Sequence, residues 1–220
     1  MGRFIPGFNY QEEKDIHLVA LGVKPASTVS LQALLLHNEE RICRGQQPNS
    51  PATIVTLTAD AIRQTEYYFS TFGVLYKTIK RAVPDGNDVC YESVSYAIAK
   101  TSTSLRQLEQ ALAREDTFAT RITLGFPEDA CQVFCRTIDG EKRNGRYVFT
   151  QIDRARAAGL SIPDWVLYLD HIPAEIDLVA GHISTESKMR AEVHLTQLRN
   201  TNPILAQEYE HCERTRIFNL

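Results

Sequence analysis

Residues capable of acid–base chemistry are concentrated in one stretch of the chain, Leu160–His182. It contains the only tryptophan and two of the six histidines. Within it, Asp170 directly precedes His171, and an aspartate that orients an imidazole is the arrangement used in general-base catalysis. The nearby aromatic side chains of Trp165 and Tyr168 would then form the wall of a pocket. This pattern predicts Asp170 and His171 as catalytic residues and Trp165 and Tyr168 as substrate-binding residues.

The same stretch also has a purely structural interpretation. Pro163 suits the first turn of a helix, and Pro173 disfavours helical geometry at the residue before it. A short, largely buried helix would therefore stop near Asp170. Since the end of a helix favours positive charge, His171 would cap this helix and Asp170 would face solvent.

Two cysteines form a second candidate group. Cys131 and Cys135 stand four residues apart on a helix expected to begin at Pro127, so their sulfur atoms share a face. Cys131 lies near the start of this helix and is a candidate nucleophile, although Glu128 and Asp129 oppose a thiolate there. Packing in the core is the alternative, because free cysteine is among the most buried residue types.

A basic segment lies between these two groups. The sequence Gly140–Arg146 resembles a phosphate loop but lacks its Lys-Ser/Thr pair, so a solvated turn is the simpler interpretation. Its cations are still suited to an anionic ligand, and Arg143 and Arg146 are therefore predicted as further substrate-binding residues.

Composition limits the class of protein. The net charge of −3 argues against an electrostatically driven nucleic-acid binder. Five cysteines, an odd number without CxxC spacing, indicate reduced thiols rather than a disulfide framework. No apolar run approaches the roughly 20 residues that a membrane span needs, and the N-terminus lacks the apolar core of a secretion signal. We therefore expect a soluble cytoplasmic protein with no membrane partner.

The helices and strands expected from the sequence, which must position these residues, indicate an α+β fold. Thr53–Thr58 reads as a strand, Ala59–Phe72 as a helix, and residues 74–81 and 89–99 as two strands joined by a turn at Pro84–Asn87. The order is βαββ, in a small mixed three-stranded sheet. An earlier helix would start at Ser27 or Thr28, with Leu31 in its apolar stripe.

The C-terminal half is expected to be predominantly helical. Its last two helices would open at Ser184 or Thr185 and at Pro203. We predict a single domain over residues 1–220, with a subdivision into residues 1–115 and 116–220.

Three short motifs resemble a family of uncharacterised microbial proteins known as a domain of unknown function. The motifs are Tyr96–Lys100, Leu124–Pro127 with Ala130 and Phe134, and Ile162–Trp165 with Tyr168 and Pro173. They cover about the C-terminal two-thirds of the chain. The resemblance implies no established activity, but it suggests that the helix at Gly125–Pro127 and the Trp165 helix belong to one site.

Three hypotheses about function follow. The first is an enzyme that acts on a polar small molecule by acid–base or thiol chemistry, with Asp170, His171 and Cys131 in the site. The second is a non-catalytic adaptor whose helical half presents a groove to a protein partner. The third is a metalloprotein, whose ligands would be drawn from Cys131, Cys135, His171 and His182.

Overall fold

The computed structural model describes residues 5–43, 55–83, 91–137 and 146–218. The chain divides into two compact units, Met1–Glu109 and Gln110–Leu220. The boundary falls inside helix α4 (Ser102–Ala113), which follows the last strand of the sheet. The α+β class predicted from the sequence is confirmed, with a small sheet in the N-terminal unit and helices dominating the C-terminal one.

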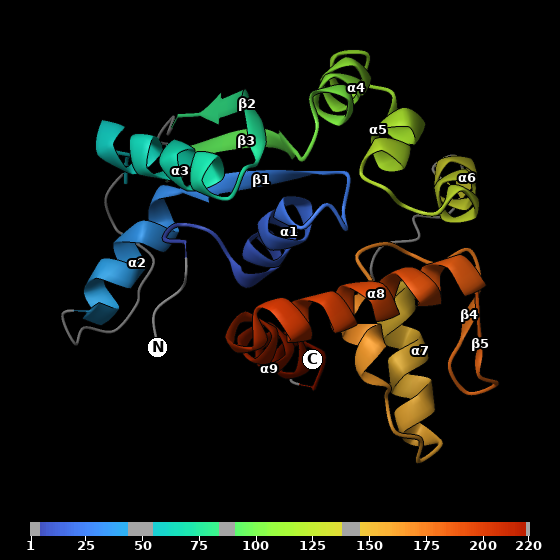
Figure 1. Cartoon of the computed structure of the whole chain (residues 1–220). Helices are drawn as coiled ribbons and strands as arrows, with labels where there is room; N and C mark the ends of the chain where they lie inside the picture. The colour runs from blue at the N-terminus through green and yellow to red at the C-terminus, as the bar shows by residue number, and fades with distance from the viewer. Residues whose placement is uncertain (1–4, 44–54, 84–90, 138–145, 219–220) are drawn as a thin grey trace. The chain divides into compact units, whose positions relative to one another are not determined.

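The N-terminal unit is built on a three-stranded antiparallel sheet in the order β1-β3-β2 (Figure 1). Its strands are β1 (Ala26–Gln32), β2 (Leu75–Ala82) and β3 (Ser93–Ala99). The central strand β3 alternates as the sequence predicts, because Val94, Tyr96 and Ile98 all enter the hydrophobic core.

Two sequence predictions about this sheet are wrong in detail. Its first strand is β1, where the sequence predicted the start of a helix, and helix α2 (Ala33–Cys43) begins only after it. Val55 forms an isolated parallel bridge with Tyr91 instead of belonging to a strand over Thr53–Thr58. The strands are therefore all antiparallel, and two helices separate β1 from β2. Residues 51–54 and the predicted turn at Pro84–Asn87 lie outside the described residues.

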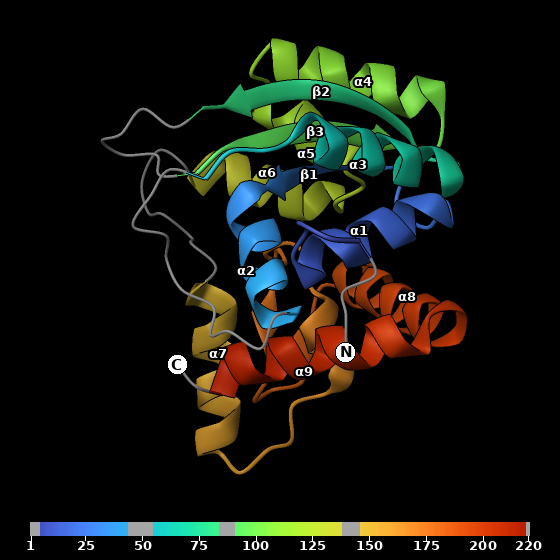
Figure 2. The same cartoon turned by 90° about the vertical axis from the view of Figure 1, so that its left-hand side faces the viewer.

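Two helices that contribute to this core, α1 (Tyr10–Ala20) and α3 (Ala59–Thr71), lie against the sheet (Figure 2). Phe69 of α3 is fully buried, with its ring centroid 5.3 Å from that of Tyr96 and 5.4 Å from that of Tyr76. Such tilted and edge-on aromatic contacts stabilise a core beyond the area that they bury.

The C-terminal unit consists mainly of helices. After α4 come α5 (Thr117–Thr123), α6 (Glu128–Thr137), α7 (Arg146–Ala157), the short 3-10 helix η1 (Asp164–Tyr168), α8 (Thr185–Thr201) and α9 (Pro203–Phe218). A small hairpin of β4 (Ile176–Asp177) and β5 (His182–Ile183) precedes α8. Helix α8 packs against both η1 and α9 (Figure 2).

Within the described residues, no helix combines the length and the apolar character that a membrane crossing requires.

Candidate active site

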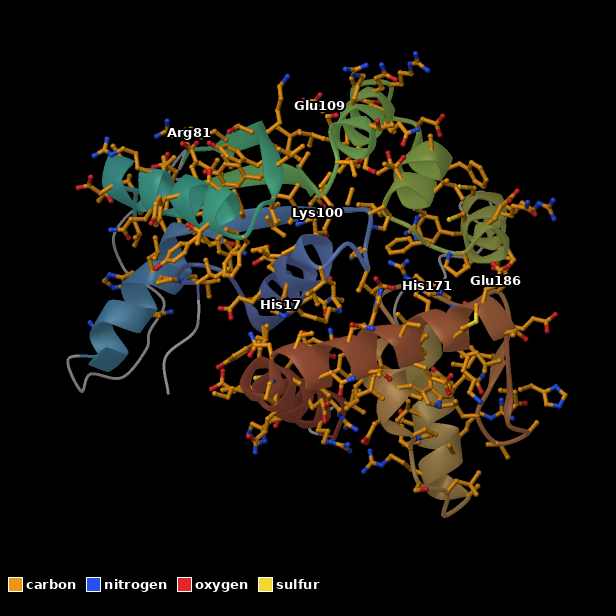
Figure 3. The ribbon with its side chains drawn as sticks, in the orientation of Figure 1. His17, Arg81, Lys100, Glu109, His171 and Glu186 are labelled. Carbon is orange, nitrogen blue, oxygen red and sulfur yellow. The ribbon has the colours of Figure 1, made fainter. Side chains whose placement is uncertain are left out.

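The predicted pair Asp170 and His171 lies just after η1, which ends at Tyr168 as the position of Pro173 suggested. Backbone geometry becomes extended at Leu169, and both following side chains turn into the C-terminal unit. The side chain of Asp170 is only 3 % exposed and that of His171 only 1 %. Asp170 therefore does not face solvent. Figure 3 shows His171 beside the N-terminal half of α8, which carries Glu186 in its first turn.

His171 is held by hydrogen bonds at both ring nitrogens. Nδ1 lies 2.9 Å from Oδ1 of Asp170, and Nε2 lies 2.8 Å from Oγ of Ser187. The hydroxyl of Ser184 donates in turn to Oγ of Ser187 at 3.0 Å. We call Asp170, His171, Ser187 and Ser184 the hydroxyl relay.

The chemistry of the partners gives the expected proton positions in the relay. A carboxylate can only accept a hydrogen bond, so we expect the ring proton of a neutral imidazole on Nδ1, donated to Asp170. Nε2 would then accept from the hydroxyl of Ser187, which itself accepts from Ser184. This is the tautomer that a serine–histidine–aspartate triad uses before it reacts.

Arg190 of α8 holds the carboxylate of Asp170, which is the buried end of the hydroxyl relay. Its Nη2 lies 3.1 Å from Oδ2 of Asp170 and its Nε lies 3.3 Å from Oδ1, a two-point contact. The same guanidinium donates to the carbonyl oxygens of Leu124 and Gly125 at the end of α5. Gly125 has a φ of 80°, a left-handed conformation that favours glycine, as it turns the chain after the helix. Arg190 thus ties α5 to the relay.

The open end of the relay lines a cavity. Ser184 is half-buried and is the N-cap residue of α8, but its side chain makes no capping bond to the backbone. Its hydroxyl bonds to Ser187 instead, while the residue lines a hollow of about 650 Å³. Four carboxylates line the same cavity: Glu128, Asp129, Glu175 and Glu186. Among the described residues, no lysine or arginine forms an ion pair with them. This acidic cavity favours a ligand with positive charge.

Cys131 is close to the relay but lines neither the acidic cavity nor the cavity lined by His171. Its side chain is buried, and Sγ lies 3.8 Å from the carbonyl oxygen of Phe126. The ring of Phe126 stacks on that of His171, with centroids 5.5 Å apart. Burial raises the pKa of Cys131 to about 11, which opposes the thiolate that a nucleophile needs. The structure therefore supports core packing for Cys131.

The two predicted aromatic wall residues lie elsewhere. Trp165 lines a different hollow, together with Pro163, His182 and Lys188. Tyr168 is fully buried, and its hydroxyl donates to Glu210 at 2.9 Å. Neither residue lines the acidic cavity or the second hollow that borders His171. Tyr168 supports η1 against α9 rather than forming a wall beside the imidazole.

The structure does not place the remaining predicted residues at the candidate site. Arg143 lies outside the described residues, and Arg146 begins α7 without a described side chain. The four proposed metal ligands do not converge, because His182 lies on β5 and both nitrogens of His171 are engaged. Among the described residues, no group of three or more histidine, cysteine, aspartate or glutamate side chains is placed to hold a metal ion.

Ser187 was not predicted as a site residue, and Ser184 was predicted only as a possible start of α8. Their signal was present as two serines three residues apart at a helix start, which places both hydroxyls on one side of the first turn. The connection to His171 depends on how α8 packs against the end of η1, which no local pattern encodes.

No family model, curated protein or solved structure matches the chain.

Proposed function

We propose that the C-terminal unit is an enzyme that acts on a small, positively charged molecule, with Ser184 as its nucleophile. The observation that carries the proposal is the hydroxyl relay. It joins an accessible serine to a buried histidine–aspartate pair through bonds of 3.0, 2.8 and 2.9 Å. A nucleophile, a base within reach and a group that orients the base are the elements of covalent acyl transfer.

The relay accounts for each proton. Oγ of Ser184 forms a bond with the carbonyl carbon of an ester or amide, and its proton moves to Ser187. The proton of Ser187 moves to Nε2 of His171, and Asp170 stabilises the resulting imidazolium. Oγ of Ser184 is then acylated, so Ser187 donates its proton to the leaving alcohol or amine as the bond between that group and the carbonyl carbon breaks, and Ser187 regains a proton from Nε2 of His171. Water then attacks the acyl carbon and gives its proton to the same Ser187–His171 pair. The bond to Ser184 breaks as its oxygen takes that proton back.

The surroundings of Ser184 supply two further elements. The N-terminal end of α8 carries the positive end of the helix dipole, which favours negative charge developing at Ser184. The four carboxylates of the acidic cavity attract a cation, so an ester or amide that carries an amine or quaternary ammonium group is the favoured substrate class.

Burial explains why we assign Ser187 to proton transfer and not to nucleophilic attack on the substrate. Ser187 is 0 % exposed, whereas Ser184 lines the cavity. The alternative role for the same bonds is structural, because they connect the end of η1 to the start of α8. Loss of the Ser187 hydroxyl would then cost stability, on the order of 1–3 kcal/mol for the unpaired imidazole nitrogen, without any change at Ser184.

A fluorophosphonate with a trimethylammonium group tests the proposal, since it reacts covalently with activated serines. We expect mass spectrometry of the full chain to locate the adduct on Ser184. The reaction should be slower with an uncharged fluorophosphonate and slower in the Ser187→Ala variant. Circular dichroism of the variant confirms that it is folded.

Thr185→Ala is the matched control, because Thr185 lines the same cavity but takes no part in the relay. It should react at the wild-type rate. Absence of an adduct on Ser184 with both reagents, or equal rates in wild type and Ser187→Ala, would contradict the proposal.

A further inference from the structure

A second cavity is lined in part by Asp170 and His171, and it is separate from the acidic cavity, which His171 does not line. Its volume is about 480 Å³, within the range of small-molecule sites, and both cavities lie in the C-terminal unit. Its walls are mostly apolar and include Phe126, Phe134, Phe149 and Ile152. The proposed reaction at Ser184 makes no use of this space.

The charges that line this apolar cavity do not cancel. Asp170 is paired with Arg190, and Glu213 is paired with Arg216 at 2.5 Å. Arg121 also lines the cavity, and within the described part of the chain no carboxylate pairs with its guanidinium. One positive charge is therefore left over in a largely apolar setting.

The surroundings of Arg121 orient it as an anion-binding group. Its guanidinium carbon lies 3.2 Å from the ring centroid of Phe134 and 5.5 Å from that of Phe126. Aromatic rings contact the flat face of a guanidinium and leave its N–H groups, which lie in the plane, available for a carboxylate or sulfonate. Burial lowers the pKa of Arg121, since a partly desolvated guanidinium is less favoured in its charged form, and a bound anion would favour that form.

We propose that this cavity binds an apolar molecule with a single negative charge, such as a medium-chain carboxylate or an aryl sulfonate. The acid group would pair with Arg121, and the apolar body would lie against Phe126, Phe149 and Ile152. Charge complementarity selects this class, because the cavity offers one unpaired cation and apolar walls. The site does not depend on the proposed reaction at Ser184.

Two fluorescent probes of nearly the same shape test this inference on the full chain. 8-Anilinonaphthalene-1-sulfonate carries a sulfonate, and N-phenyl-1-naphthylamine has the same rings without it. We expect Arg121→Gln to weaken binding of the sulfonate probe roughly tenfold or more, as the loss of a charge-assisted pair implies. Binding of the neutral probe should stay within about twofold, since its apolar contacts remain.

Arg136→Gln is the matched control, because Arg136 is exposed on α6 and does not line this cavity. It should bind both probes as the wild type does, and so should Ser184→Ala. Equal affinity of wild type and Arg121→Gln for the sulfonate probe would overturn the inference. Equal weakening of both probes in that variant would also overturn it.

A measurement on the wild type keeps the test valid if Arg121→Gln does not fold. Octanoate should raise the midpoint of thermal unfolding, and the shift should grow with the logarithm of its concentration above Kd, because ligand binding stabilises the folded state. Octanamide, which has the same length and no charge, should raise it less. Equal shifts for the two compounds would contradict an anion site.

Discussion

Each unit of this protein buries an aspartate, but the two aspartates have different surroundings. In the N-terminal unit, Nζ of Lys24 and Oγ of Ser27 lie 2.6 and 2.7 Å from Oδ2 of Asp15, and Lys14 lies 3.6 Å from Oδ1. In the C-terminal unit, Asp170 also has a cationic partner, Arg190, but it contacts in addition the imidazole of His171, which leads through Ser187 to Ser184.

This comparison separates two uses of a buried carboxylate. Around Asp15, opposite charges meet directly and hold α1 to the segment that enters β1. Around Asp170, neutral groups that can exchange protons continue to the wall of a cavity. A burial value alone does not distinguish the two cases. The two cases are distinguished by the groups to which each aspartate is connected, which are cations at Asp15 and proton-exchanging side chains at Asp170.

Breaking the relay at the imidazole should have the largest effect. We expect His171→Gln to slow phosphonylation of Ser184 by about 10²- to 10⁴-fold, because the amide cannot take up the proton. The rate is measured by mass spectrometry of the intact protein over time. His182→Gln, on the exposed strand β5, is the control and should react normally. If His171→Gln reacts as fast as wild type, the relay has no catalytic role.

Breaking the charge cluster in the N-terminal unit should affect stability instead. Asp15→Asn leaves the buried ammonium of Lys24 without its carboxylate, so the free energy of unfolding should fall by about 3–5 kcal/mol. Urea unfolding followed by circular dichroism measures the loss. Asp60→Asn, which breaks an exposed pair with Arg63, should change stability little. Similar results for the two variants would show that the buried cluster contributes no more than a surface pair.

The smallest expected effect concerns Cys131, a buried residue near the relay to which we assign no catalytic role. Its pKa is raised from 9.0 to about 11 by burial, so the folded state binds the proton more tightly than the unfolded state. This contribution to stability is complete below pH 9 and is lost as the pH rises toward about 11. Cys131→Ala should therefore show a smaller loss of unfolding free energy over this interval than wild type. An identical loss would mean that this thiol does not titrate differently on folding.

The fold was predictable where local pattern and tertiary packing agree. Val94, Tyr96 and Ile98 alternate with small polar residues and form the central strand as expected. The prediction failed at Leu31, because its spacing to Leu34 and Leu35 also fits a helix. Strand β1 passes into α2 at Ala33 with no proline or glycine to mark the change.

The site was predictable only as far as residues adjacent in the chain. Asp170 and His171 do form a pair, and they are neighbours in sequence. Ser187 completes the relay from 16 residues beyond His171, by a contact between the end of η1 and α8. The charge of Arg121, with which no carboxylate of the described residues pairs, was equally hidden, since a sequence does not show which arginines lack a carboxylate partner.

The direction of hydrogen bonding at His171 is the central claim, and nitrogen NMR of the imidazole tests it most directly. The His171 signals are assigned by their absence in His171→Gln, and the spectra are recorded at neutral pH. We predict a protonated Nδ1 and an unprotonated Nε2, as required if Ser187 donates to the ring. A ring protonated at Nε2 and unprotonated at Nδ1 would reverse the bond to Ser187 and contradict the account.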